Sequence, residues 1–206
     1  MTDPHRIHSE SQLREVIPEP HPAIQQKVFD HVDSFAAAFI EKSPLLLLAT
    51  VGEDGGIDVS PKGDAPGFVS VEDEKTLLIP DRPGNKLAYG FRNLLARPEV
   101  GILFVVPGVA ETLRVNGRAE ITRDPALLER FAARGRNALL VTRVHVDESF
   151  FHCGKAFVRS SLWKPATWPT GAKADIGKQI AARRGAGDDL AQAIEKSLAE
   201  DLRDGL

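Results

Sequence analysis

The chain has 206 residues, of which 42% are hydrophobic and 27% charged, with a formal net charge of −3 and a single cysteine. These values are typical of one globular domain of ordinary size. They exclude an intrachain disulfide and argue against general nucleic-acid binding, which needs a basic domain. The longest apolar runs are far shorter than the roughly 18–20 residues that span a bilayer, and the first ten residues lack the pattern of a secretory signal. We therefore expect a cytoplasmic protein with no membrane or nucleic-acid partner.

The pattern of apolar residues and turn signals predicts many short strands and few helices. In chain order, we expect a polar arm over residues 1–20, a helix over 22–42, strands over 45–51 and from 57 to 60, a strand pair over 68–72 and 76–80, a helix from 83 to 97, β segments over 100–106 and 111–121, a helix opening at Asp124-Pro125, a strand over 138–146, a helical turn over 147–155, an extended piece over 156–160, and one or two helices within 171–206. Asn116-Gly117 is a turn signal, and Pro61 is expected to end its ladder or to create a bulge. This pattern favours an antiparallel barrel or sandwich over a doubly wound parallel sheet.

The segment after the strand at 76–80 is the most informative part of the sequence. Pro83 suits the first turn of a helix, and Leu87, Phe91 and Leu94 follow at helical spacing. A helix that opens with Arg82-Pro83-Gly84-Asn85-Lys86 would present free backbone N–H groups and two cations to an anion. From spacing alone this is a candidate phosphate site, and a solvated helix start is the alternative.

Two other basic segments carry candidate ligand contacts. Lys62-Gly63 follows Ser60-Pro61 and could place an ammonium group and accessible backbone beside a planar ligand, or could be an ordinary surface loop. Lys155, Arg159 and Trp163 combine two cations with a large ring, which suits an anionic aromatic ligand, whereas the alternative is an arginine beside a packed tryptophan.

The sequence offers no established catalytic motif. No dinucleotide fingerprint, Walker A motif or zinc-protease motif occurs, and no nucleophile-elbow sequence supports a Ser-His-Asp triad. His152 and Cys153 are metal-ligand types, but they have no partners at the spacing of a zinc site. We therefore expect no metal, and we assign no catalytic residue.

Together these segments resemble the pyridoxamine 5′-phosphate oxidase-like family of FMN-binding split β-barrels, and in particular a branch of FMN-dependent enzymes without an assigned substrate. The motifs that carry the resemblance lie between residues 35 and 169 and are Ser60-Pro61-Lys62-Gly63-Asp64, Pro80-Asp81-Arg82-Pro83-Gly84-Asn85-Lys86, Thr112-Leu113-Arg114-Val115-Asn116-Gly117-Arg118, and His152-Cys153 with Lys155, Arg159 and Trp163. Each motif is modest alone, but their order is specific.

The resemblance implies a six-stranded antiparallel split barrel that forms a homodimer with FMN at the subunit interface. The residues it assigns to the cofactor are Ser60, Pro61, Lys62, Gly63, Asp81, Arg82, Asn85, Lys86, Lys155, Arg159 and Trp163. Of these, Asn85 and Lys86 take the place of the family's phosphate-binding pair. Lys155, Arg159 and Trp163 are expected to reach the flavin of the other subunit. The barrel domain is predicted over residues 21–169, with an N-terminal arm over 1–20 and a helical appendage over 171–206.

The function implied is that of an FMN-dependent oxidoreductase acting on a small-molecule substrate. The vitamin B6 oxidase itself has an Arg-Lys pair where this chain has Asn85-Lys86, and its C-terminal ending is not recognisable here. Oxidation of vitamin B6 is therefore not expected. Two alternatives stay open: a non-catalytic flavin or haem carrier on the same barrel, and a deazaflavin-dependent reductase.

Overall fold

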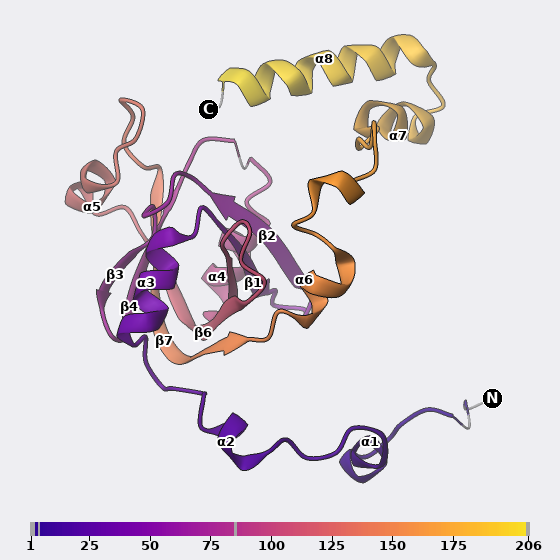
Figure 1. Cartoon of the computed structure of the whole chain (residues 1–206). Helices are drawn as coiled ribbons and strands as arrows, with labels where there is room; N and C mark the ends of the chain where they lie inside the picture. The colour runs from indigo at the N-terminus through magenta and orange to yellow at the C-terminus, as the bar shows by residue number, and fades with distance from the viewer. Residues whose placement is uncertain (1–2, 4, 85, 205–206) are drawn as a thin grey trace.

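A computed structural model describes residues 3, 5–84 and 86–204 of the chain (Figure 1). The strands are β1 (Leu45–Val51), β2 (Ile57–Gly63), β3 (Ser70–Asp73), β4 (Thr76–Asp81), β5 (Glu99–Val105), β6 (Thr112–Thr122) and β7 (Leu140–His152). The helices are α1 (Glu10–Val16), α2 (Pro22–Gln25), α3 (Ser34–Lys42), α4 (Tyr89–Ala96), α5 (Pro125–Arg130), α6 (Lys155–Ser160), a 3₁₀ turn η1 (Pro165–Thr167), α7 (Ile176–Arg183) and α8 (Asp188–Asp204).

One antiparallel sheet organises the molecule, with the strand order β2-β1-β5-β6-β7-β4-β3. The prediction of a mainly β, antiparallel fold with peripheral helices is confirmed. The prediction of a six-stranded barrel is wrong, because the sheet has seven strands and does not close. The extra strand is the short β3 at one edge, which pairs with β4 around an irregularity between Val71 and Asp73.

The core lies on the concave side of this sheet and comes from alternate residues of the strands. In β1, Leu46, Leu48 and Thr50 are buried while their neighbours in sequence are less so, as expected for a strand with one covered face. Ile40 of α3 and Phe104 of β5 are fully buried in the same cluster. Burial of this kind is the main stabilising contribution to the fold.

The β1–β2 hairpin forms as predicted, but β2 continues beyond Pro61 to Gly63. Pro61 lies opposite Leu47 with the pairing register unbroken. The strand accepts this proline because β2 is an edge of the sheet, where a backbone N–H can be dispensed with.

The single helix predicted over residues 22–42 is instead two short helices, α2 and α3. Between them Phe29 forms an isolated bridge to Ser149 of β7, with backbone hydrogen bonds in both directions. These bonds hold the chain extended, and a new helix then begins after Asp33, whose carboxylate accepts a hydrogen bond from the Ala36 amide.

The region from residue 140 to 160 also departs from expectation. The predicted helical turn over 147–155 is the second half of the long strand β7, and the predicted extended piece over 156–160 is the helix α6. β7 stays extended because its whole length pairs with β6, a tertiary contact that local sequence does not reveal.

Asn116-Gly117 is not a turn. It lies within β6 at a shift of register against β7, which is a bulge. A side chain at position 117 would place its Cβ 2.0 Å from the backbone oxygen of His145. Glycine is therefore required here by the close approach of the next strand.

We predict that Gly117→Ala destabilises the protein by about 2 kcal/mol or more, because the methyl group must displace the β7 backbone. The free energy of unfolding in urea measures this effect. Gly187→Ala is the matched control, since its Cβ would meet nothing within 4 Å. An equal, small effect for both variants would show that the bulge does not need glycine.

The terminal helices lie on opposite sides of the sheet in Figure 1, with α1 and α2 at one end and the α7–α8 pair at the other. α7 and α8 approach closely at Gly177, whose added Cβ would lie 2.4 Å from the Ala191 backbone oxygen. Within the described residues, none of the helices combines the length and hydropathy that crossing a membrane requires.

Candidate functional site

An ion pair bridges two strands that are far apart in the sheet order. Lys62 of β2 places its Nζ 2.8 Å from Oδ1 of Asp81, at the end of β4, and the two side chains are only 11% and 10% exposed. β2 and β4 have no backbone pairing in the sheet, so the sheet must curl until these two strands face each other. We call this unpaired junction the seam.

The seam pair is supported by a helix and a second ion pair. The Lys62 ammonium lies 4.5 Å from the ring centroid of Phe91 in α4, a cation–π distance. Directly after β4, the Arg82 Nε donates to Asp64 Oδ2 at 2.7 Å, and Arg82 Nη1 donates to the Phe131 carbonyl at 2.6 Å. Two segments, one after β2 and one after β4, are thus joined by two cation–carboxylate contacts.

The Asp64 carboxylate stays charged in this setting. Burial alone would raise its pKa, but hydrogen bonds from the Ala65 amide and the Arg82 guanidinium outweigh burial and lower the pKa below its ordinary value. Arg134 also lies 3.7 Å from this carboxylate. The second seam pair is therefore fully ionised near neutral pH.

A cavity of about 330 Å³ opens at the seam. Its lining residues are Ser60, Pro61, Lys62, Gly63, Pro80, Asp81 and Arg82. The structure thus brings together the candidate residues that the sequence placed on two separate motifs. It also shows what sequence reasoning missed: Asp64, which is part of the quoted Ser-Pro-Lys-Gly-Asp motif, and Phe91, which looked like an ordinary core position of a helix.

The helix start predicted at Pro83 is wrong. α4 begins at Tyr89, after Ala88 in a left-handed conformation with a φ of 50°. Gly84 has a φ of 128°, and the Lys86 amide donates to its carbonyl at 2.9 Å, so residues 82–87 form a turn. The expected anion site at a helix N-terminus opening with Arg82 is therefore not formed.

The predicted phosphate pair does not join the cavity lining. Asn85 lies outside the described residues. The Lys86 side chain is 87% exposed and reaches Asp201 of α8, with 3.6 Å between Nζ and Oδ1. The assignment of these two residues to a phosphate stays a prediction that rests on the resemblance alone.

The third group of candidates lies elsewhere. Lys155 and Arg159 of α6 line a different cavity, of about 420 Å³, together with Ala110, Glu111, Cys153, Gly154 and Val158. Trp163 stacks on Phe157 with 5.8 Å between ring centroids and donates from Nε1 to the Val109 carbonyl. Trp163 is thus a packed residue that braces the loop before β6.

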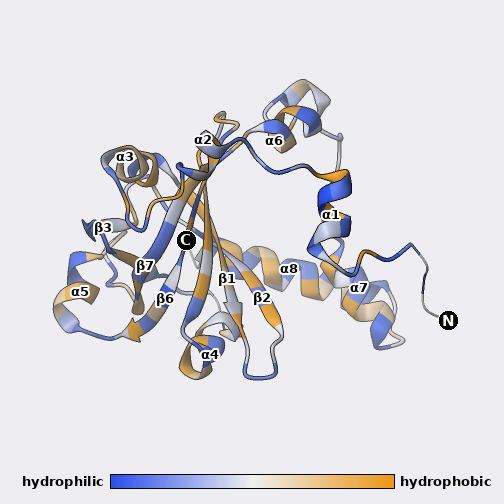
Figure 2. Cartoon of the chain, turned by 90° about the horizontal axis from the view of Figure 1, so that it is seen from below, coloured by the Kyte–Doolittle hydropathy of each residue, from blue (hydrophilic) through white to orange (hydrophobic). Residues whose placement is uncertain are grey.

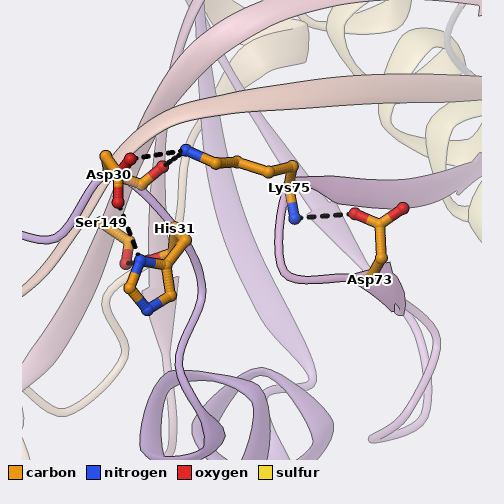
Figure 3. Close-up of polar contacts among 5 residues, drawn as sticks. All are labelled: Asp30, His31, Asp73, Lys75 and Ser149. Atoms are coloured by element: carbon orange, nitrogen blue, oxygen red, sulfur yellow. Dashed lines mark hydrogen bonds and ion pairs between the residues drawn. The ribbon is translucent and has the colours of Figure 1, made fainter.

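A Ser-His-Asp cluster exists but does not have the geometry of a hydrolase triad (Figure 3). Asp30 Oδ1 lies 2.8 Å from His31 Nδ1, whereas the Ser149 hydroxyl donates to the backbone carbonyl of His31 and not to its ring. Hydrogen bonds from His31 and Lys75 lower the pKa of Asp30 to about 2. The cluster fastens the segment before α3 to β7 and to the β3–β4 turn. Among the residues described, no three His, Cys, Asp or Glu side chains form a group that could hold a metal ion.

Comparison with known proteins identifies the class. The family model described as pyridoxamine 5′-phosphate oxidase matches residues 32–153, more than half of the chain. The chain belongs to the pyridoxamine 5′-phosphate oxidase family. The matched region contains the seam and its cavity and ends before Lys155.

Solved structures agree at the level of the fold. The chain is similar to HupZ of Group A Streptococcus, with 21% identity over 58% of this chain and 93% of that chain and a TM-score of 0.48. It is also similar to General Stress Protein 26 of Bacillus anthracis, with 16% identity over 55% and 88% of the two chains and a TM-score of 0.42. Identities and TM-scores this low carry no argument about activity. No curated protein matches the sequence.

We predict that Asp81→Ala costs about 3 kcal/mol of unfolding free energy, because it leaves the Lys62 ammonium unpaired in a nearly buried position. Urea unfolding followed by circular dichroism measures the loss. Asp201→Ala is the matched control: it removes the same side chain from an exposed ion pair and should change stability by no more than about 0.5 kcal/mol. Similar losses in both variants would contradict the importance of the seam pair.

Proposed function

We propose that this protein is an FMN-dependent oxidoreductase that acts as a homodimer on a small-molecule substrate. Membership of the pyridoxamine 5′-phosphate oxidase family supports this proposal. The observation that carries it is the seam cavity, because its lining contains Ser60, Lys62 and Arg82, which the resemblance assigns to the flavin. Those residues come from different motifs, and only the curled sheet brings them to one place.

The donor set of the cavity suits an anion. A phosphate monoester carries a charge of about −1.5 to −2 near neutral pH and accepts hydrogen bonds from several donors. Of the five N–H groups that a guanidinium offers, Arg82 uses Nε for Asp64 and one Nη1 hydrogen for Phe131. The other donors of Arg82 can serve an anion without breaking either contact. Ser60 adds a hydroxyl at the same cavity.

The size of the cavity indicates that this chain supplies only part of the binding site. Its volume of about 330 Å³ lies at the low end of the roughly 300–1,000 Å³ typical of ligand pockets. A flavin mononucleotide held there would extend beyond it. We propose that a second copy supplies the remaining wall through Lys155 and Arg159, which line their own cavity on α6.

The outer face of the sheet supports pairing with a second copy. Ile57 and Val59 of β2 are 75% and 58% exposed, and Leu45 of β1 is 37% exposed. Figure 2 shows the hydrophobic colouring of β1 and β2. Contiguous apolar side chains on a sheet edge are costly to leave in water and mark an interaction surface. We therefore propose that this face is covered in the homodimer.

When bound, the flavin supplies the hydride or electron transfer, while the protein binds, orients and tunes it. Lys62 and Asp81 hold the two strand ends at the correct separation. Arg82 and Ser60 donate hydrogen bonds to the anionic end of the cofactor. This division of labour needs no acid–base pair of the hydrolase type.

We predict that Arg82→Gln weakens FMN binding about tenfold or more, since it removes a charge-assisted hydrogen bond. Flavin fluorescence titration measures affinity, and absorption spectra with NADH or NADPH test reduction of the bound flavin. Lys196→Gln, which removes an exposed lysine of α8, is the control and should bind as the parent does.

Protein purified without added cofactor should be yellow and should release FMN on denaturation. Mass spectrometry of the released ligand separates FMN from deazaflavin, and the visible spectrum separates flavin from haem. Lys86→Ala tests the phosphate assignment of the turn separately from that of the cavity. A folded Arg82→Gln protein with undiminished FMN affinity would overturn the cavity as the cofactor site.

A further inference from the structure

A second cationic cluster lies on β6 and β7, away from the residues of the seam. Arg114 of β6 lies directly opposite Phe150 of β7 in the strand register, and His152 follows Phe150 on the same face of β7. Lys27, from the segment between α2 and the Phe29 bridge, reaches the same place. The guanidinium of Arg114 is 5.8 Å and the ammonium of Lys27 is 5.6 Å from the Phe150 ring centroid.

These positive groups converge without a counter-ion. Among the described residues, neither Lys27 nor Arg114 has a carboxylate within ion-pair distance. The neighbouring Glu148 is engaged by Asn116, whose Nδ2 donates to it at 2.6 Å. Long cationic side chains on a surface ordinarily diverge into water or pair with acids. Here three elements instead direct them to one ring.

We infer that Lys27, Arg114 and His152, gathered around Phe150, form a binding subsite for a small molecule that carries a carboxylate or phosphate group. Arg114 offers the forked donors that match an oxyanion, and Lys27 adds a point charge. The Phe150 ring supplies an apolar floor that keeps both cations in place. This subsite does not depend on the proposed function, because none of its residues lines the seam cavity.

The imidazole of His152 reports on occupancy. Burial is the largest effect that lowers its pKa, and the charges of Arg114 and Lys27 lower it further. Those two cations are the charged groups recorded as acting on it. An oxyanion between them offsets their charge, so its binding should raise the pKa of His152 and take up a proton near neutral pH.

The test is a pair of titrations of the full chain at constant ionic strength in sodium chloride. Sulfate serves as the probe for a phosphate group and benzoate as the probe for a carboxylate. Calorimetry measures affinity, and NMR of the histidine rings, assigned with His152→Gln, follows the His152 pKa. We expect saturable binding of at least one probe together with a rise in the His152 pKa. The preferred probe identifies the chemistry of the natural ligand.

Arg114→Gln and Lys27→Gln should each weaken probe binding about tenfold. Arg118→Gln is the matched control, because Arg118 is an exposed arginine on the same strand and its loss should leave binding unchanged. Binding of neither probe, or equal losses in Arg114→Gln and Arg118→Gln, would overturn the subsite. Unchanged probe binding with an altered oligomeric state would also overturn it and would assign the cluster to a protein interface.

FMN affinity separates this inference from the proposed function. If Arg114→Gln lowers FMN and sulfate affinity together, the cluster belongs to the flavin site and the separate subsite is overturned. If the protein binds sulfate at Arg114 but does not bind FMN, only the proposed function fails.

Discussion

The ion pair between Lys62 and Asp81 is the contact on which the arrangement of the site depends. It joins β2, one edge of the sheet, to β4, which lies near the other edge, where no backbone hydrogen bonds connect them. Two nearly buried charges are expensive to desolvate, so this contact is not explained by stability alone. It fixes where the curled sheet stops short of closure, and the opening it leaves is the cavity of the candidate cofactor site.

The incompleteness of that cavity links fold to assembly. The seam presents cations that are already partly satisfied by Asp81 and Asp64, and it encloses a small volume. The cavity bearing Lys155 and Arg159 lies on another part of the chain, and the outer face of β1 and β2 leaves apolar side chains in water. These are the properties expected of half-sites that two copies complete. The cluster around Phe150 adds a charged surface that the cofactor proposal does not use.

The sequence predicted the elements whose signals are local. β1 has the predicted bounds because apolar residues end at a hairpin turn, and α5 begins as predicted because Asp124 caps it and Pro125 fits its first turn. The start of α4, the length of β7 and the bulge at Gly117 depend on tertiary contacts and were not predictable locally. Similarly, the motifs of β2 and β4 pointed to a common ligand through the family resemblance, but their meeting across the seam and the roles of Asp64 and Phe91 required the curl of the sheet.

A double-mutant cycle on the seam pair tests this account most directly. Unfolding free energies of the parent, Lys62→Met, Asp81→Asn and the double variant give the coupling between the two side chains. A favourable coupling of about 1.5 kcal/mol or more would establish that the two strand ends are held together through this pair. Additivity within about 0.5 kcal/mol would show that the charges do not interact across the seam and would contradict the account.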